Sequence, residues 1–334
     1  MNTIRYSKAI NSVKLKKDLD KKESIENARL ISQSVNPGKE LSNCPICLHS
    51  EFSFLCNIYG FNYVNCQYCG SALVRNPPDD NDLRDLYVSQ YYTESNKKLY
   101  ANDSLVDYRI EQIAKPKVSH ILGSIKSKPS SWLDIGCGTG EIISVANDSG
   151  LRAVGIETNP MQREYARKRF GLDINDEYIT PENINQFGGN FDIISMFSVL
   201  EHVLNPRDLI HSVTNIQNSG NHIVIEVPHY PSLSVASQMT YPDYVNRMMH
   251  PPFHLFIFSE KAIEMLFKEY GYEAINYWFF GQDVYEYLTT LELVAGNFNG
   301  SRLKDILWPL IEEMQMVVDK NGYSDEMLVI GRKL

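Results

Sequence analysis

The sequence predicts an α/β protein built on a doubly wound, Rossmann-like sheet, preceded by a small cysteine-rich ribbon and a helical connector. Three observations predict this fold. Strand-like and helix-like runs alternate from Ser131 onward, which is the pattern of consecutive βαβ units in a parallel sheet. A glycine-rich turn at residues 136–140 joins the first of these strands to the first helix, and two Cys-x-x-Cys pairs lie between residues 44 and 69.

Local sequence signals mark the ends of the predicted helices. Pro160 suits the first turn of a helix, Ser259 is a helix N-cap, and Gly171 and Gly271 suit helix ends. We expect strands at 132–135, 153–156, 191–197, 222–227, 272–280 and 327–330, and helices at 141–149, 206–217 and 260–270.

Composition divides the chain into four parts. Residues 1–40 are polar and predict an N-terminal arm with a solvated helix between Val13 and Leu30. Residues 41–80 hold the cysteine pairs, and residues 81–128 predict a helical connector or cap rich in tyrosine. Residues 129–334 form the α/β domain. About 45 largely helical residues separate its last two strands, which indicates a helical insertion at about 281–322.

Charge and hydropathy exclude several classes of partner. The chain has 41 acidic and 32 basic residues and a formal charge of −9, which disfavours nucleic acid and anionic lipid as partners. It has neither a run of about 20 apolar residues nor the apolar segment of a signal peptide. We therefore expect a cytoplasmic protein with a small-molecule partner.

The two cysteine pairs predict a structural zinc site. Cys44, Cys47, Cys66 and Cys69 have the spacing C-x2-C-x18-C-x2-C, which is typical of four-thiolate zinc ribbons. Four protein ligands leave no coordination position for chemistry. The alternative is four unligated thiols, and the two remaining cysteines are interpreted as ordinary buried thiols.

The glycine turn predicts a cofactor site. Gly136, Gly138 and Gly140 allow the backbone to approach a ligand closely at a helix N-terminus. The dinucleotide fingerprint requires a third glycine at position 141, where this chain has Glu141. This disfavours a nicotinamide dehydrogenase. S-adenosylmethionine (SAM) has no pyrophosphate, and its ammonium group suits an acid such as Asp134 or Glu141.

A second acid completes the pattern. Glu157 ends the second predicted strand, 17 residues after Gly140, where a carboxylate can accept hydrogen bonds from both ribose hydroxyls. The alternative is a glycine turn with an unrelated surface glutamate. The combination of turn, strand and acid favours SAM binding.

With these motifs, residues 115–334 resemble the class I SAM-dependent methyltransferases. The resemblance implies that the three glycines line SAM, that Glu157 binds its ribose, and that residues near Asp176 and Phe197 contact its adenine and methionine parts. It also implies an antiparallel last strand at 327–330. The matching stretches are 133–140, 154–157, 191–194, 199–203 with Pro206, and 254–259.

The order of ribbon, tyrosine-bearing connector and catalytic core resembles bacterial methyltransferases that act on nucleotide-linked deoxysugars, including sugar C-methyltransferases. The C-methyltransferases usually continue into a further α/β domain, whereas this sequence stops at the last predicted strand. The resemblance implies a sugar nucleotide or glycan precursor as the acceptor of an O- or C-methylation.

Five residues are candidates for catalysis. Methyl transfer is an in-line displacement that needs alignment and, for a hydroxyl or acidic carbon, one base. Glu201 and His202 follow the strand at 191–197, at the sheet edge where ligands bind. His202 would be the base and Glu201 would orient it, although the pair could simply brace the next helix. His229 has the same claim from its position, and Tyr91 and Tyr92 have one from the resemblance to sugar enzymes.

Two other functions remain open. An RNA methyltransferase could hold RNA with its ribbon, but residues 41–80 contain Arg75 as their only Lys or Arg. A non-catalytic scaffold could retain the fold and SAM binding without turnover.

Overall fold

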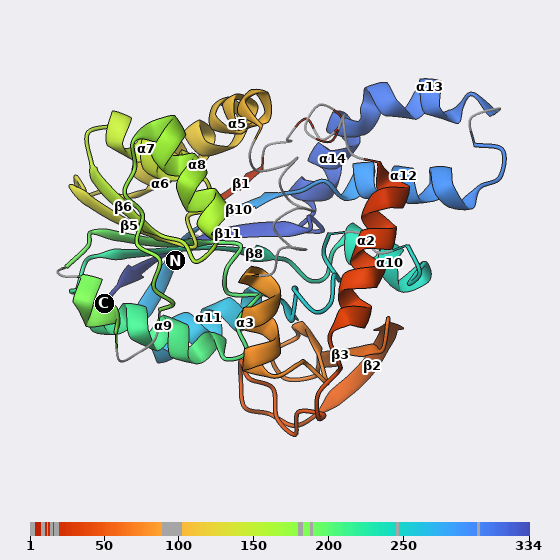
Figure 1. The fold of residues 1–334 in the computed structure, drawn as a ribbon, viewed down its shortest axis with the longest axis horizontal. Coiled ribbons are helices and arrows are strands. Elements are labelled where there is room, and N and C mark those ends of the chain that lie inside the picture. Colours follow the sequence, from red (N-terminus) through yellow and green to blue (C-terminus); the bar gives the residue numbers. More distant parts are fainter. Residues whose placement is uncertain are drawn as a thin grey trace.

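The structure is a computed structural model in which the chain forms two sheets flanked by helices (Figure 1). The larger sheet has seven strands in the order β1-β10-β11-β8-β7-β5-β6, and the smaller has four in the order β2-β3-β4-β9. The structure describes residues 4–7, 11, 13, 16, 20–88, 102–179, 183–187, 190–244, 247–298 and 301–334.

The seven-stranded sheet confirms the predicted doubly wound fold. Its parallel strands are β5 (Ser131–Ile135), β6 (Arg152–Ile156), β7 (Ile193–Phe197) and β8 (His222–Pro228). Strand β11 (Glu326–Lys333) is antiparallel to both β8 and β10 (Tyr272–Phe280), as the resemblance implied. Strand β5 lies between β6 and β7 and is parallel to both, so the carboxyl ends of the three strands share the sheet edge where the glycine turn follows β5.

Helices cover both faces of this sheet (Figure 1). On one side lie α5 to α8, and on the other lie α9 and α11. Ser259 caps α11 by accepting a hydrogen bond from the amide of Ala262, as its sequence position indicates. The helix bounds are α5 (Asp103–Arg109), α6 (Lys115–Ser124), α7 (Glu141–Asp148), α8 (Pro160–Phe170), α9 (Pro206–Asn215) and α11 (Glu260–Glu269), with a π-helical turn at Ile110–Ala114.

The N-terminal segment differs from the polar arm that the sequence predicts. Strand β1 (Ile4–Ser7) pairs in parallel with β10 at the edge of the large sheet. Helix α2 (Lys21–Ser34) is a surface helix with one buried face, which contains Ala28, Ile31 and Ser32. Ile31 packs with Leu86 and Phe253, so one face of α2 contributes to a small apolar cluster.

The cysteine-rich ribbon shares its sheet with the catalytic core. Its strands are β2 (Phe52–Ile58), β3 (Phe61–Cys66) and β4 (Ala72–Val74). Strand β9 (Phe256–Ile257), which comes after β8 in the chain, pairs antiparallel with β4. The sequence does not predict this pairing. The ribbon is therefore built into the core beside the segment that follows β8.

The predicted helical insertion lies between β10 and β11. It contains α12 (Asp283–Val294), α13 (Leu303–Leu307), a 3-10 turn at Trp308–Leu310 and α14 (Ile311–Lys320). Helix α12 contacts α10 (Leu233–Thr240), and the connector includes α3 (Asp80–Val88). Another 3-10 turn spans Ile184–Phe187. Among the described residues, no helix combines the length and apolar composition that a membrane span requires.

Candidate active site

The glycine turn has the backbone conformation that its sequence predicts. Gly136, Gly138 and Gly140 all have positive φ, at 69°, 55° and 84°. The amide of Gly136 donates to the carbonyl of Ile156 at 2.8 Å, which fixes the turn against β6. A Cβ at Gly136 would lie 2.5 Å from Cγ2 of Val199. The left-handed backbone and this close contact together require glycine.

Glu157 closes the turn from the end of β6. Its Oε2 accepts from the amide of Gly138 at 3.0 Å, and its Oε1 accepts from the amide of Asn159 at 2.7 Å. Burial raises the pKa of Glu157, although these two amide donors act against the increase. The carboxylate is thus held in place beside the glycine turn and can still accept further hydrogen bonds.

A cavity of about 380 Å³ lies beside this turn. Glu157 and Gly136 line one part of it, and the apolar side chains of Ile156, Ile179 and Leu209 line another. Asp80 and Arg84 from α3 also line it. The cavity therefore combines a hydrogen-bond acceptor for ribose hydroxyls with apolar walls suited to a purine ring.

Asp176 does not line this cavity. Its side chain is exposed, and its Oδ2 lies 3.5 Å from Nη2 of Arg163. The neighbours Glu177, Tyr178 and Ile179 line the cavity instead. The residues that follow Asp176 thus form this part of the cavity wall.

The acids near the helix N-terminus have partners within the protein. Asp134 is buried and accepts from the hydroxyl of Ser195 at 2.5 Å. Burial raises the pKa of Asp134 to about 7. Glu141 forms an ion pair with Arg109 of α5, with 2.6 Å between Nη2 and Oε1. The sequence does not single out Arg109, whose contact with Glu141 joins residues 32 positions apart.

Phe197 ends β7 and packs against the apolar cluster that contains Trp132 and Ile193. It is half-buried, and Nζ of Lys117 lies 5.3 Å from its ring centroid. Phe197 is not among the residues that line the cavity.

His202 is held by two groups that the sequence does not indicate. Its Nδ1 lies 2.9 Å from the carbonyl oxygen of Phe253 and 2.7 Å from the hydroxyl oxygen of Tyr87. A carbonyl can only accept, so the contact with Phe253 favours a proton on Nδ1 and a lone pair on Nε2, and the carbonyl of Ser198 also acts on the ring. Burial lowers the pKa of His202 to about 4. The imidazole is therefore neutral at pH 7.

Glu201 does not orient this imidazole. Its Oε1 lies 3.6 Å from Nε2 of His202, which is too long for a hydrogen bond. The carboxylate is fully buried, and neither oxygen has a hydrogen-bond partner among the described residues. Burial raises the pKa of Glu201 well above its ordinary value. The carbonyl of Phe253 and the hydroxyl of Tyr87 hold the ring instead.

His254 joins Glu201 and His202 in one cluster. Its Nδ1 donates to the carbonyl of Met248 at 2.9 Å, and its ring centroid lies 4.9 Å from that of His202. One ligand atom from each of the three side chains lies within 4.8 Å of the others. The only sequence signal for this arrangement is the Glu-His pair itself.

His229 lies elsewhere, at the end of β8. Its Nδ1 donates to the carbonyl of Ser324 at 2.9 Å, and its ring packs edge-on against Phe279. Tyr91 and Tyr92 fall in residues 89–101, outside the part of the chain that the structure describes. Within the described part of the connector, Tyr87 is a tyrosine that contacts His202.

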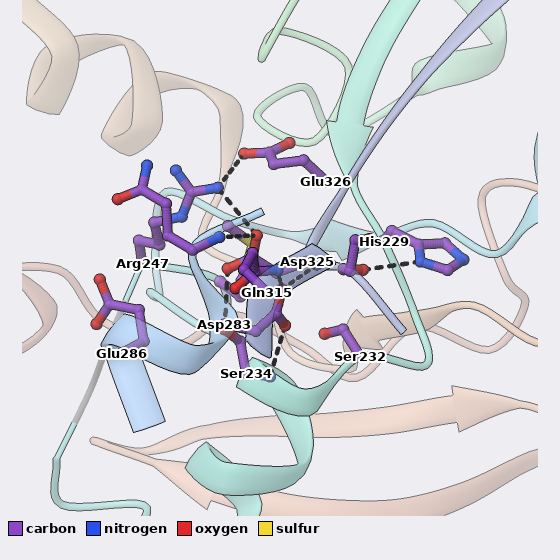
Figure 2. A network of polar contacts seen from close by, with 12 residues as sticks. His229, Ser232, Ser234, Arg247, Asp283, Glu286, Gln315, Asp325 and Glu326 are labelled. Atoms are coloured by element: carbon purple, nitrogen blue, oxygen red, sulfur yellow. Dashed lines mark hydrogen bonds and ion pairs between the residues drawn. The ribbon is translucent and has the colours of Figure 1, made fainter. Parts of the chain in front are cut away.

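A buried polar network fixes the insertion to β11 (Figure 2). Arg247 donates to Glu326 at 2.7 Å, and Ser234 donates to Asp325 at 2.9 Å. Gln315 of α14 donates to Asp283 of α12 at 2.9 Å. Burial, and then the charge of Asp325, raises the pKa of Asp283. These contacts hold the start of β11 at the same sheet edge as the cluster of Glu201, His202 and His254.

The four ribbon cysteines lie together and are buried or nearly so. Their sulfur atoms all lie within 4.8 Å of one another, with 3.8 Å between Cys44 and Cys69 and 3.5 Å between Cys47 and Cys66. Zinc–sulfur bonds of about 2.3 Å in a tetrahedron require sulfur atoms about 3.8 Å apart. The thiols therefore fit zinc. Cys56 and Cys137 are buried apart from this cluster.

The sheet, the glycine turn and Glu157 define a class I SAM-dependent methyltransferase. The chain belongs to the family described as the methyltransferase domain, whose model matches residues 106–277, about half of the chain. It is 24% identical over 121 residues to a ubiquinone biosynthesis O-methyltransferase of Erwinia tasmaniensis, covering 35% of this chain and 50% of that protein.

Other relatives also match part of the chain. A norajmaline N-methyltransferase of Rauvolfia serpentina is 27% identical over 133 residues, covering 38% of this chain and 46% of that protein. The chain spans about half the length of these curated relatives. A SAM-dependent methyltransferase structure from Archaeoglobus fulgidus has 19% identity and a TM-score of 0.47, covering 73% of this chain and all of that one.

Proposed function

We propose that this protein transfers the methyl group of SAM to a small acceptor, a nucleotide-linked sugar or another glycan precursor. The observation that carries the proposal is the cavity formed by the glycine turn, Glu157 and apolar side chains at the carboxyl ends of the parallel strands. Ligands of open α/β sheets bind at this edge. Glu201 and His202 follow β7 at the same edge and are the residues we expect beside the acceptor.

The glycine turn and Glu157 would bind the nucleoside and amino acid parts of SAM. Glu157 would accept hydrogen bonds from the ribose hydroxyls while it remains bonded to the amide of Gly138. Arg109 lies beside Thr139 and Glu141 at the N-terminus of α7, where a carboxylate is favoured. We propose that Arg109 helps to hold the SAM carboxylate.

His202 would accept the acceptor's proton when no metal ion is bound to the cluster of Glu201, His202 and His254. Its Nε2 carries a lone pair, and 22% of its side chain is exposed, so an acceptor can reach it. Tyr87 and Phe253 hold the ring in that orientation. The domain order supports a sugar acceptor, and the small-molecule substrates named for the relatives support a small one.

We further propose that Cys44, Cys47, Cys66 and Cys69 bind one structural zinc ion per chain. Their spacing and the distances between their sulfur atoms support a tetrahedral site. Such an ion would hold the two turns of the ribbon together and leave no open position for an acceptor.

Transfer of labelled methyl groups from SAM tests the function. The purified protein should label a nucleotide-linked deoxysugar from a panel and should not label tRNA or ribosomal RNA. His202→Ala should bind SAM with parental affinity and lower turnover by at least about tenfold. His211→Ala, on an exposed position of α9, is the matched control and should keep the parental rate. Labelling of RNA alone, or a parental rate for His202→Ala, would contradict the proposal.

A further inference from the structure

We propose that Glu201, His202 and His254 bind a divalent transition-metal ion, and that this second metal site holds the oxygen of a hydroxyl acceptor. The geometry alone supports the binding of the ion, whereas the role that we assign to the ion rests on the proposed function. The ion would differ from the zinc of the cysteine site, because its ligands are two imidazoles and one carboxylate.

The ligand atoms have suitable spacing. One atom from each side chain lies within 4.8 Å of the other two, and Oε1 of Glu201 lies 3.6 Å from Nε2 of His202. Ligand bonds of about 2.1 Å at angles of 90° to 110° require ligand atoms about 3.0 to 3.4 Å apart. The Glu201–His202 distance is within a few tenths of an ångström of this range, and His254 offers a third ligand atom within 4.8 Å of both.

The protons of the two imidazoles lie on the side away from the cluster. His202 donates from Nδ1 to the carbonyl of Phe253, and His254 donates from Nδ1 to the carbonyl of Met248, both at 2.9 Å. Both Nε2 atoms therefore present lone pairs. A second hydrogen bond to a backbone carbonyl is the arrangement that orients metal-bound histidines in proteins.

Glu201 supplies the independent evidence for a ligand. Its side chain has no exposed surface, and neither carboxylate oxygen has a hydrogen-bond partner among the described residues. Buried carboxylates without partners are costly, so a missing positive group is expected beside them. A carboxylate and two imidazole lone pairs gathered around one point favour a cation there.

The position of the cluster suggests what the ion does. Three protein ligands leave coordination positions open, unlike the four-cysteine site. His202 is 22% exposed, so a ligand can reach the cluster. A hydroxyl bound to the ion loses its proton to water more readily. The resulting oxygen attacks the methyl carbon, the O–C bond forms, and the electron pair of the S–C bond stays on sulfur, giving S-adenosylhomocysteine. The proposal therefore predicts O-methylation.

Binding of Mn²⁺ to the full-length, zinc-loaded protein tests the site without an acceptor. Titration calorimetry should give one Mn²⁺ per chain, and Mn²⁺ should raise the melting temperature of the parent protein. Glu201→Gln and His254→Gln should each weaken Mn²⁺ binding by at least about tenfold, in the range reported for the loss of supporting groups at metal sites. His211→Gln should bind Mn²⁺ like the parent.

The outcomes separate the two proposals. No Mn²⁺ binding, or equal binding by the parent, Glu201→Gln and His254→Gln, would overturn the metal site. Gln has nearly the same size as Glu, so Glu201→Gln should fold. A melting temperature close to that of the parent, with both proteins measured without Mn²⁺, shows that the variant is folded. Full methyl transfer by chelated protein would overturn the role of the ion but leave the methyltransferase proposal intact. Mn²⁺ binding without transfer to any acceptor would contradict only the proposed function.

Discussion

The replacement of Glu157 by alanine tests the SAM site most directly. Oε1 and Oε2 of this carboxylate accept from two backbone amides at 2.7 Å and 3.0 Å, and Glu157 lines the cavity. A hydrogen bond to a charged group contributes about 1.5–3 kcal/mol, so the loss of even one ribose contact should weaken SAM binding by about 10- to 150-fold. Titration calorimetry with SAM measures this change.

The same substitution also leaves two amides without their acceptor. The variant should therefore be less stable, by about 1–3 kcal/mol for each amide that water does not reach. Urea unfolding without SAM measures this second effect. Glu157→Gln retains one acceptor oxygen, so it should lose less SAM affinity and less stability than Glu157→Ala. If Glu157→Ala is folded and binds SAM with parental affinity, the ribose assignment is wrong, because no other change in the turn would compensate.

Three further predictions follow from the structure. Cys66→Ser should lose zinc, measured by elemental analysis, and a full zinc content would refute the ribbon site. Gly136→Ala should lower SAM affinity at least tenfold because its Cβ would meet Val199 at 2.5 Å, while Gly123→Ala, with nothing within 4 Å, should bind SAM normally. Asp134 has a pKa of about 7, raised by burial from 3.8. As pH rises from about 4 to above 7, the free energy of unfolding of the parent should therefore fall by up to about 4 kcal/mol relative to that of Asp134→Asn. Urea unfolding of both proteins across this pH range measures the difference. The same pH dependence in both proteins would exclude the raised pKa.

The core of the fold is predictable because its signals are local. The predicted strand at 153–156 and helix at 260–270 correspond to β6 (Arg152–Ile156) and α11 (Glu260–Glu269) within one residue at each end. Strands β1 and β9 have four and two residues, too few to show an alternating pattern. Their partners lie far away in the chain, so only the assembled structure reveals them.

The site is less predictable because its contacts join distant segments. The position of Glu201 and His202 after a predicted strand identifies them in the sequence. The spacing of its glycines identifies the glycine turn. The groups that decide the chemistry of His202 come from α3, through Tyr87, and from the loop that contains Phe253. The burial that lowers its pKa is a property of the packed structure. No spacing in the sequence indicates either contact.

Strand β9 gives the ribbon a mechanical connection to the site. It starts two residues after His254, and the hydroxyl of Tyr63, on β3, donates to the carbonyl of His254 at 2.8 Å. Phe256 and Ile257 are almost wholly buried where β9 meets β4. The ribbon consequently cannot be exchanged or removed like an independent module. A change that loosens the ribbon sheet would therefore also loosen the backbone that positions His254.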